Sequence, residues 1–230
     1  MIRIEDAALE RSALTGEMDI AIPVEVYLPA DGEPEITTFA LCEDIVREYA
    51  ARFAEDLLGE SAIAWLSAQV TAQIADYGYT YAPDPSTVIA EYQARNPAPM
   101  QSSGSVIRLD VAENRHEYRN ETSVEFDFTD DVDDPVFAAV ENNAIVSCAC
   151  INDADYANGA LELYVETAQA HRNRGYGKMC VAALTNHLLQ QGKIIWYKCY
   201  EGNYASVAVA KGCGLALAGR RAALVCYANA

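Results

Sequence analysis

The sequence predicts an α/β (α+β) protein whose C-terminal part alternates strands and helices, behind a mostly helical N-terminal region. Three observations predict this class. An apolar, strand-like run at 161–167 leads through a glycine turn into an apolar-periodic helix. Strand-like runs at 135–140 and 144–150 are joined by a short polar turn, as in a hairpin. Apolar residues recur every three or four positions over 38–58, which is the stripe of an amphipathic helix.

Residues 1–100 carry no chemical motif and are predicted to form the mostly helical region, which covers or extends the C-terminal part. Residues 18–28 alternate as a strand that Pro23 interrupts or edges. The predicted helices are 38–58, 61–77 with Ser61 as N-cap, and 86–95. A stretch rich in Pro, Ser and Gly at 96–105 is linker-like, so the predicted domains are 1–100 and 101–230.

The segment Arg-Asn-Arg-Gly-Tyr-Gly at 172–177 is the most informative motif. A strand that delivers two glycines to a helix N-terminus places successive backbone N–H groups around one point. Glycine has no Cβ, so the backbone can approach an anion closely and can adopt a positive φ. Arg172, Arg174 and Lys178 add positive charge at this place in a chain whose net charge is −18. The sequence therefore predicts an anion cradle, most often one for phosphate.

Two common phosphate-binding motifs are excluded by the spacing of the glycines. A P-loop requires Gly-x-x-x-x-Gly-Lys-Ser/Thr, and the chain has no such run. A dinucleotide-binding fingerprint requires Gly-x-Gly-x-x-Gly, but Cys180 stands where the third glycine would be. The pattern that remains is Arg-x-x-Gly-x-Gly.

This pattern resembles the acetyl-CoA pyrophosphate loop of the GNAT N-acetyltransferase superfamily. Flanking blocks extend the resemblance: 160–167 is similar to the family's fourth strand, 194–199 to its fifth strand, and 135–150 to the preceding hairpin. Asn203-x-x-Ser206, followed by Ala210 and Gly214-Leu, is similar to the next helix. The resemblance covers about residues 124–230. It is closest to uncharacterised bacterial GNAT proteins with an added N-terminal region.

The resemblance implies a fold and an activity. The implied fold is a mixed, largely antiparallel sheet flanked by helices and splayed between the fourth and fifth strands, with 215–218 and 222–227 as final strands. The implied activity is that of an N-acyltransferase, which moves an acyl group, by default acetyl, from acyl-CoA to a primary amine by direct transfer in a ternary complex. A catalytically weak acyl-CoA-binding sensor or interaction module is the alternative. An NAD or nucleotide enzyme would need a different glycine pattern.

The resemblance also implies which residues bind the co-substrate, acetyl-CoA or another acyl-CoA. Backbone groups of the fourth strand would bond the pantetheine arm, and the N–H groups of 174–178 would receive the pyrophosphate. The matching residues are Val165, Glu166, Thr167, Arg172, Arg174, Gly175, Tyr176, Gly177, Lys178, Asn203 and Ser206. No metal is expected, because Cys148-x-Cys150 has no second pair or nearby His to complete a site.

Acyl transfer to an amine needs a neutral amine and a proton for the departing thiolate. Glu162 and Glu166 share one face of the predicted strand with Tyr164, and either carboxylate can accept the amine's proton. Glu162 is the first candidate, because of the resemblance. The equal alternative is that both face solvent or pair with Arg172 or Arg174. Many members have Tyr where this chain has Ala210, so the general acid is unassigned, with Tyr200, Tyr204 and Cys213 nearby in sequence.

Composition limits the partners and the compartment. A net charge of −18 disfavours nucleic acid and anionic membranes and suits an amine-bearing acceptor, although a role in solubility is the more economical explanation. The acidic segment 121–134 is read as a solvated strand face, or alternatively as the mouth of a site for a cationic amine. Seven cysteines within apolar runs indicate buried thiols in a reducing compartment. With no signal peptide or membrane span expected, the prediction is a cytoplasmic protein, with a homodimer left open.

Overall fold

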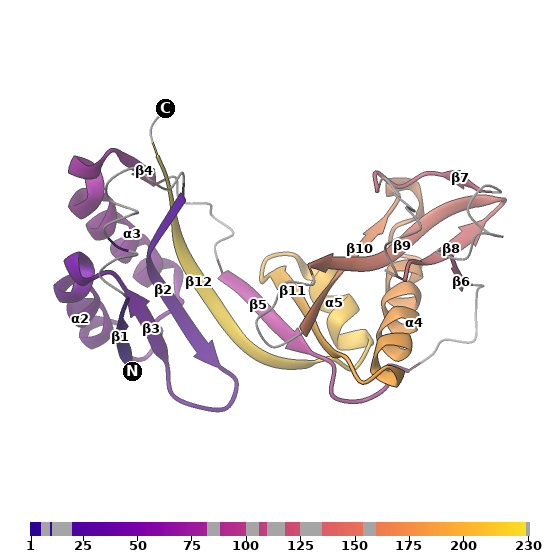
Figure 1. Ribbon diagram of the computed structural model, residues 1–230, viewed down its shortest axis with the longest axis horizontal. Coiled ribbons are helices and arrows are strands. Elements are labelled where there is room, and N and C mark those ends of the chain that lie inside the picture. The colour runs from indigo at the N-terminus through magenta and orange to yellow at the C-terminus, as the bar shows by residue number, and fades with distance from the viewer. Residues whose placement is uncertain are drawn as a thin grey trace. The chain divides into compact units, whose positions relative to one another are not determined.

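The computed structural model describes residues 1–5, 10, 20–81, 88–99, 106–109, 118–124, 135–153 and 160–228. The chain divides into two compact units (Figure 1). The first comprises 1–90, 200–202 and 218–230, and the second comprises 91–199 and 203–217. The two units differ from the predicted division at residue 100. The first unit includes 218–230 as well as 1–90, because 219–227 pairs with the strand at 20–29. Among the described residues, no helix has the length and hydropathy of a membrane span.

The first unit is a sheet backed by helices. Its strands are β1 (Ile2–Ile4), β2 (Ile20–Pro29), β3 (Glu35–Thr38) and the first-unit part of β12 (Ala216–Ala228), in the order β1-β3-β2-β12, with β4 (Tyr79–Tyr81) pairing β12. Its helices are α2 (Glu43–Arg52) and α3 (Glu60–Ile74), with short 3₁₀ turns at Ala40–Cys42 and Ala75–Tyr77. One core joins them: Val24 and Leu224 from the sheet pack with Val46 and Leu66 from the helices. Each of these four is at most 1% exposed.

The predicted elements of residues 1–100 are partly confirmed. The strand expected over 18–28 is β2, and the two longer predicted helices are α2 and α3. The N-cap of α3 is Gly59 and not Ser61. The third predicted helix, 86–95, is wrong: Val88–Gln93 forms strand β5. Its Val, Ile and Tyr suit a strand, and a run this short cannot be assigned by periodicity alone. The region is therefore mixed and not mostly helical.

The second unit contains a sheet in the order β5-β11-β10-β9-β8-β6, with β7 paired to β9. The strands not yet given are β6 (Val106–Arg108), β7 (Arg119–Asn120), β8 (Phe137–Glu141), β9 (Ala144–Asp153), β10 (Ala160–Thr167) and β11 (Ile194–Tyr200). The predicted hairpin is confirmed as β8 and β9, and its turn residues Asn142 and Asn143 have φ values of 50° and 59°. Two adjacent positive φ values are typical of a type I′ turn, and Asn tolerates them.

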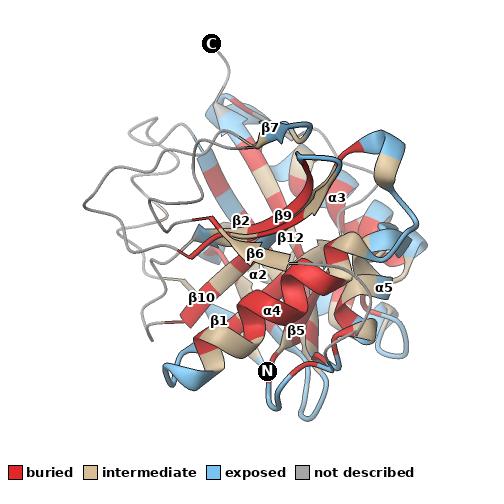
Figure 2. Cartoon of the chain, turned by 90° about the vertical axis from the view of Figure 1, so that its right-hand side faces the viewer, coloured by how far each residue is buried: buried red, intermediate tan, exposed pale blue. Residues whose placement is uncertain are grey.

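Helices α4 (Tyr176–Gln190) and α5 (Tyr204–Gly212) complete the second unit, with a 3₁₀ turn at Gln169–His171 before α4. Helix α4 packs on β8, β9 and β10, and Figure 2 shows buried residues along its length. At its C-terminal end Gly192, with φ of 73°, donates its N–H to the carbonyl of Leu189 at 3.0 Å. This is the glycine stop that the sequence predicts.

The predicted splay between the fourth and fifth strands is confirmed as a short pairing of β10 with β11. The two strands pair in parallel only where Ala160–Glu162 meets Ile194–Trp196. Beyond Glu162, β10 continues to Thr167 and stays paired with β9 alone, after a bulge between Glu162 and Leu163. The pairings β10–β9, β12–β2, β12–β4, β2–β3, β6–β8 and β8–β9 are antiparallel, whereas β1–β3, β10–β11 and β7–β9 are parallel. The sheet class is therefore mixed and largely antiparallel, as expected.

The final strands are a correction to the predicted fold. In place of two strands at 215–218 and 222–227, β12 runs unbroken from Ala216 to Ala228. The Gly-Arg-Arg that looks like a break lies within the strand. A Cβ on Gly219 would lie 2.5 Å from the ring of Tyr27, so this glycine serves close packing within the first unit and not a turn.

Candidate active site

Among the described strands, β11 diverges from β10 after Glu162, so one edge of β10 is unpaired over 163–167. The space between the two diverging strands is called the gap below. The N–H of Ala168 bonds the carbonyl of Val146 at 2.9 Å, and the same register pairs Glu166 with Cys148. Bonding residues alternate along an antiparallel ladder, so the backbone groups of Glu166 face β9. The carbonyl of Glu166 also accepts from Ser147 Oγ at 2.8 Å. By the same alternation, the backbone groups of Val165 and Thr167 point away from β9, toward the gap.

The loop after β10 has the backbone geometry of an anion cradle. Asn173 and Gly175 have φ values of 63° and 85°, and Gly175 is the N-cap of α4. No side chain caps this helix in the part of the chain that the structure describes. The N–H groups of Tyr176, Gly177 and Lys178 therefore lie at the positive end of the helix dipole without a side-chain acceptor. This geometry fits an anionic ligand.

Gly177 contributes through close packing. It is buried in the first turn of α4, where a Cβ would lie 3.1 Å from Thr167 Oγ1 and 3.4 Å from Val165 Cγ2. Thr167 Oγ1 is itself 2.9 Å from Ser147 Oγ, so it has little freedom to move. The absent side chain is thus what lets the N-terminus of α4 lie directly against β10.

The three cations predicted around the loop all make contacts with the protein. The Nε of Arg172 donates to the carbonyl of Thr167 at 3.1 Å, which ties the loop back to the end of β10. Arg174 pairs with Glu141 at 3.2 Å between Nη1 and Oε2. The stem of Lys178 lies over Gly212 of α5, with its Cδ 2.6 Å from where a Cβ would be. These side chains therefore shape the loop as well as charge it.

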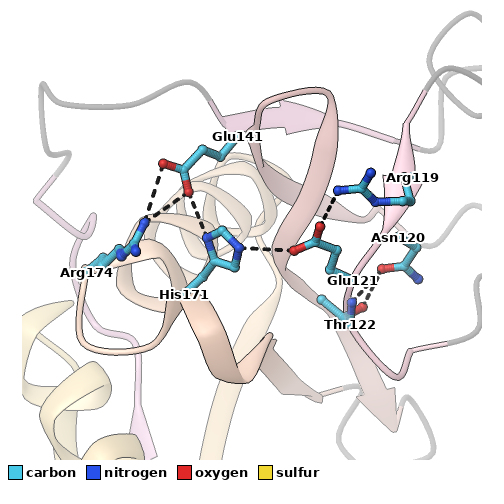
Figure 3. A network of polar contacts seen from close by, with 7 residues as sticks. All are labelled: Arg119, Asn120, Glu121, Thr122, Glu141, His171 and Arg174. Carbon is cyan, nitrogen blue, oxygen red and sulfur yellow. Dashed lines mark hydrogen bonds and ion pairs between the residues drawn. The ribbon is translucent and has the colours of Figure 1, made fainter.

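His171 links this loop to two carboxylates, as Figure 3 shows. Its Nδ1 lies 2.7 Å from Glu141 Oε2, and its Nε2 lies 3.0 Å from Glu121 Oε2. An ionised carboxylate only accepts, so both contacts are hydrogen bonds only when both ring nitrogens carry protons. Arg174 also contacts Glu141, and a hydrogen bond from Arg119 lowers the pKa of Glu121.

The sequence did not reveal this network, because Glu121 is one of a run of acids and His171 belongs to none of the motifs described above. The described part of that run, 121–124, is tied to the loop through Glu121, whereas 125–134 lies outside the described residues. The only sequence signal was that His171 directly precedes Arg172. The partners of His171 come from two distant segments that only the fold brings together.

The two candidate catalytic carboxylates have different surroundings. Glu162 pairs with Lys198 of β11 at 3.0 Å between Oε2 and Nζ, and the side chains are 17% and 26% exposed. The sequence offered two alternatives to a catalytic role for Glu162: exposure to solvent, or pairing with Arg172 or Arg174. The partner in the structure is Lys198 instead. Glu166 accepts from the N–H and Oγ of Ser123 at 3.0 and 2.7 Å and from the Tyr164 hydroxyl at 3.3 Å. The hydrogen bond from Ser123 Oγ is the main cause of a lowered pKa for Glu166.

The pH dependence of stability should report the Ser123–Glu166 contact. A lowered folded pKa contributes stability that is complete above the unfolded value, about 4.3, and is lost as the pH falls through the folded value. We expect Ser123→Ala to cost about 1 kcal/mol at pH 7, because the hydroxyl donates to a charged but partly exposed acceptor. The cost should shrink in acid. Thermal unfolding across pH checks this, with the exposed Ser61→Ala as control; a cost that is the same at every pH would contradict it.

The start of α5 agrees with the sequence in one respect and leaves the proton donor open. Asn203 is the N-cap, and its side chain accepts from the N–H of Ser206 at 3.2 Å, as predicted. Ala210 and Cys213 are fully buried, and burial raises the pKa of the Cys213 thiol to about 11. Tyr200 and Tyr204 are exposed. A hydroxyl that sequence reasoning missed is that of Tyr197, whose pKa burial raises to about 12 and whose side chain hydrogen-bonds Ser206.

The remaining sequence expectations concern cysteines and metals. None of the seven cysteines forms a disulfide bond, and five of them are buried, in agreement with the predicted role as small apolar residues. Burial raises the pKa of Cys148 and of Cys180 to about 12, so these thiols are unreactive at neutral pH. Among the residues that the structure describes, no group of three His, Cys, Asp or Glu side chains is arranged to hold a metal ion.

An open strand edge that leads into an uncapped, glycine-bearing helix N-terminus is suited to an elongated anionic ligand. Residues 105–215 match the family model described as the acetyltransferase (GNAT) family. These residues, a little under half of the chain, are therefore a GNAT acetyltransferase domain, as the sequence motifs predict. None of the curated proteins compared with it matches.

Several solved structures are similar to the chain. A GNAT-family acetyltransferase structure from Novosphingobium aromaticivorans is 13% identical with a TM-score of 0.48, over 66% of this chain and 69% of that one. A GCN5-related N-acetyltransferase from Kribbella flavida is 14% identical with a TM-score of 0.46, over 69% and 63%. A GCN5-related N-acetyltransferase-like protein from Streptococcus suis is 15% identical with a TM-score of 0.41, over 70% and 68%. The family assignment rests on the family model and not on these distant likenesses.

Proposed function

We propose that the second unit binds acetyl-CoA, or another acyl-CoA, and transfers the acyl group directly to a primary amine in a ternary complex. The observation that carries the proposal is the continuity of the gap with the cradle. The open edge of β10 begins where β11 diverges after Glu162 and ends at Thr167, and the loop to the uncapped N-terminus of α4 follows. A ligand with an amide-bearing arm and a phosphate group needs these two features in this order.

The residues of the chain fit the co-substrate as follows. The backbone groups of Val165 and the N–H of Thr167 would bond the pantetheine arm, since the Thr167 carbonyl already accepts from Arg172. The first-turn N–H groups of α4 would hold the pyrophosphate. Glu166 would contribute no backbone contact, since its backbone faces β9. Asn203 and Ser206, at the start of the helix that follows β11, would border the same gap. When bound, acyl-CoA supplies the acyl group as an activated thioester.

Glu162 is the proposed base. It lies at the closed end of the gap, five residues before Thr167, which is about 17 Å along a strand. This separation keeps the carboxylate away from the pyrophosphate and next to the far end of a ligand held in the gap. An acceptor amine arrives as an ammonium, and Glu162 can take its proton. Glu166 is a weaker candidate, because three hydrogen bonds hold it and its lowered pKa makes it a poorer base.

The acceptor is proposed to be cationic, because the net charge of −18 would favour such a substrate near the protein. A cytoplasmic location and a homodimer also stay predictions of the sequence.

A second candidate is a binding module that senses acyl-CoA without efficient turnover. The fully buried Ala210, at a position where many members of the family have a tyrosine, favours it. The proton donor of the enzyme would then be missing. Tyr197 supports the enzyme as a candidate donor, because its buried hydroxyl is protonated at neutral pH and hydrogen-bonds Ser206 of α5.

Calorimetric titration of the protein with acetyl-CoA, followed by assay of CoA release against a panel of amines, tests both candidates. Micromolar binding with CoA release supports the enzyme. Binding without release against any amine supports the module. A folded protein that does not bind acetyl-CoA would overturn both.

A further inference from the structure

One lysine of this chain lies beside the proposed base. The chain has four lysines, Lys178, Lys193, Lys198 and Lys211. Lys198 lies on β11 two residues beyond Trp196, the last residue of β11 that pairs with β10. Its Nζ is 3.0 Å from Glu162 Oε2. A primary amine and the carboxylate proposed to deprotonate an acceptor amine are thus already in contact at the closed end of the gap.

The geometry points to Lys198 as an internal acyl acceptor, a lysine that the protein acylates on itself. The inference rests on the proposed function. The ammonium of Lys198 first gives one proton to Glu162. The neutral Nζ then attacks the acyl carbon of the bound thioester, so that a C–N bond forms and the C–S bond breaks. The second proton leaves Nζ for the departing thiolate, which gives free CoA, and the proton on Glu162 passes to water. No oxidant or reductant is needed.

The direction of the gap supports this assignment. The anion cradle follows the C-terminal end of β10, and Glu162 lies about 17 Å before that end. A ligand whose phosphate sits at the cradle therefore carries its far end toward Glu162 and Lys198. Both side chains are mostly shielded, at 17% and 26% exposed, which limits competing attack by water.

Acylation of Lys198 would also change the site. The amide product has no charge, so the ion pair with Glu162 is lost. The carboxylate is then available to the ammonium of an external acceptor. Self-acylation would therefore prime Glu162 for the proposed reaction.

The first experiment compares two reagents on the wild-type protein by peptide mapping of its four lysines. With acetic anhydride and no acetyl-CoA, Lys198 should react more slowly than Lys193 and Lys211, which are exposed, because it is shielded and ion-paired. With acetyl-CoA alone, the order should reverse, and Lys198 should be acetylated first. This reversal would show that bound co-substrate directs the acyl group. Acetylation of Lys193 or Lys211 before Lys198 with acetyl-CoA would overturn the inference.

Matched variants then test separately the role of Lys198 as acyl acceptor and that of Glu162 as base. Lys198→Arg keeps a cation opposite Glu162 but cannot be acetylated, and Glu162→Gln keeps Lys198 but removes the carboxylate. We expect no acetylation at position 198 in the first, a loss of about tenfold or more in its rate in the second, and the wild-type rate in Lys193→Arg. A rate in Glu162→Gln equal to wild type would overturn the stated chemistry.

Acetyl-CoA titrations of the same preparations distinguish a failure of self-acylation from a failure of acetyl-CoA binding. If acetyl-CoA binds and Lys198 stays unmodified, the self-acylation inference fails and the proposed function stands. If acetyl-CoA does not bind to the folded protein, the proposed function fails and the inference with it.

Discussion

Replacing Gly177 with Asp is expected to weaken acetyl-CoA binding by about 100-fold or more, which corresponds to about 2.7 kcal/mol. Two effects act together. The new Cβ would lie 3.1 Å from Thr167 Oγ1 and push the N-terminus of α4 away from β10. The new carboxylate would also occupy the positive end of the helix dipole in place of a phosphate. Calorimetric titration with acetyl-CoA measures the loss.

Gly202→Asp is the matched control for this variant. It adds the same carboxylate at a glycine around which nothing lies within 4 Å of an added Cβ. Its affinity for acetyl-CoA should stay within about twofold of wild type, an energy difference of about 0.4 kcal/mol. Circular dichroism and thermal unfolding should show that both variants are folded. Wild-type affinity in a folded Gly177→Asp protein would remove the cradle from the proposed site.

Replacing Glu162 with Gln is expected to lower kcat by about 100-fold to 10,000-fold once an acceptor amine is known, the range for loss of a positioned base. Acetyl-CoA affinity should be retained, because Glu162 lies at the end of the gap away from the cradle. The deficit should shrink as the pH rises toward the pKa of the acceptor, where the free amine is abundant. Steady-state kinetics across pH, together with acetyl-CoA titration, measure both.

Glu166→Gln discriminates between the two carboxylates that the sequence singles out. Its side chain is held by Ser123 and Tyr164, so its replacement should reduce kcat much less than that of Glu162. A larger loss from Glu166→Gln than from Glu162→Gln would exchange their roles. Equal and small losses would favour the sensor module, for which neither carboxylate transfers a proton.

Local patterns explain why the loop was predictable from the sequence. A strand, a glycine pair and an apolar-periodic helix follow one another over 160–190, and each part specifies its own backbone conformation. Gly175 has the positive φ and Gly177 the close packing that such a turn requires. The hairpin at 137–153 and the N-cap Asn203 were predictable for the same reason, since both depend on neighbours in sequence.

Features that depend on strand register were not predictable. The pairing of Lys198 with Glu162 requires that β11 lie beside β10 and stop pairing at Trp196, which no spacing along the chain reveals. Which backbone groups of β10 point away from β9, those of Val165 and Thr167 and not those of Glu166, follows from the register of its pairing with β9. Strand β5 was misread as a helix because Val88–Gln93 gains its conformation from neighbouring strands.

The C-terminal strand has a consequence for how this protein is made. Residues Ile20–Pro29 pair with Gly219–Tyr227, so the sheet of the first unit lacks one of its strands until 219–227 have been synthesised. The first unit therefore cannot complete its sheet until the whole of the second unit has been translated. Pairing across such a long stretch of chain is slow, and an unpaired strand edge invites aggregation. Removal of 219–227 should accordingly unfold the first unit, although most of that unit lies at the other end of the sequence.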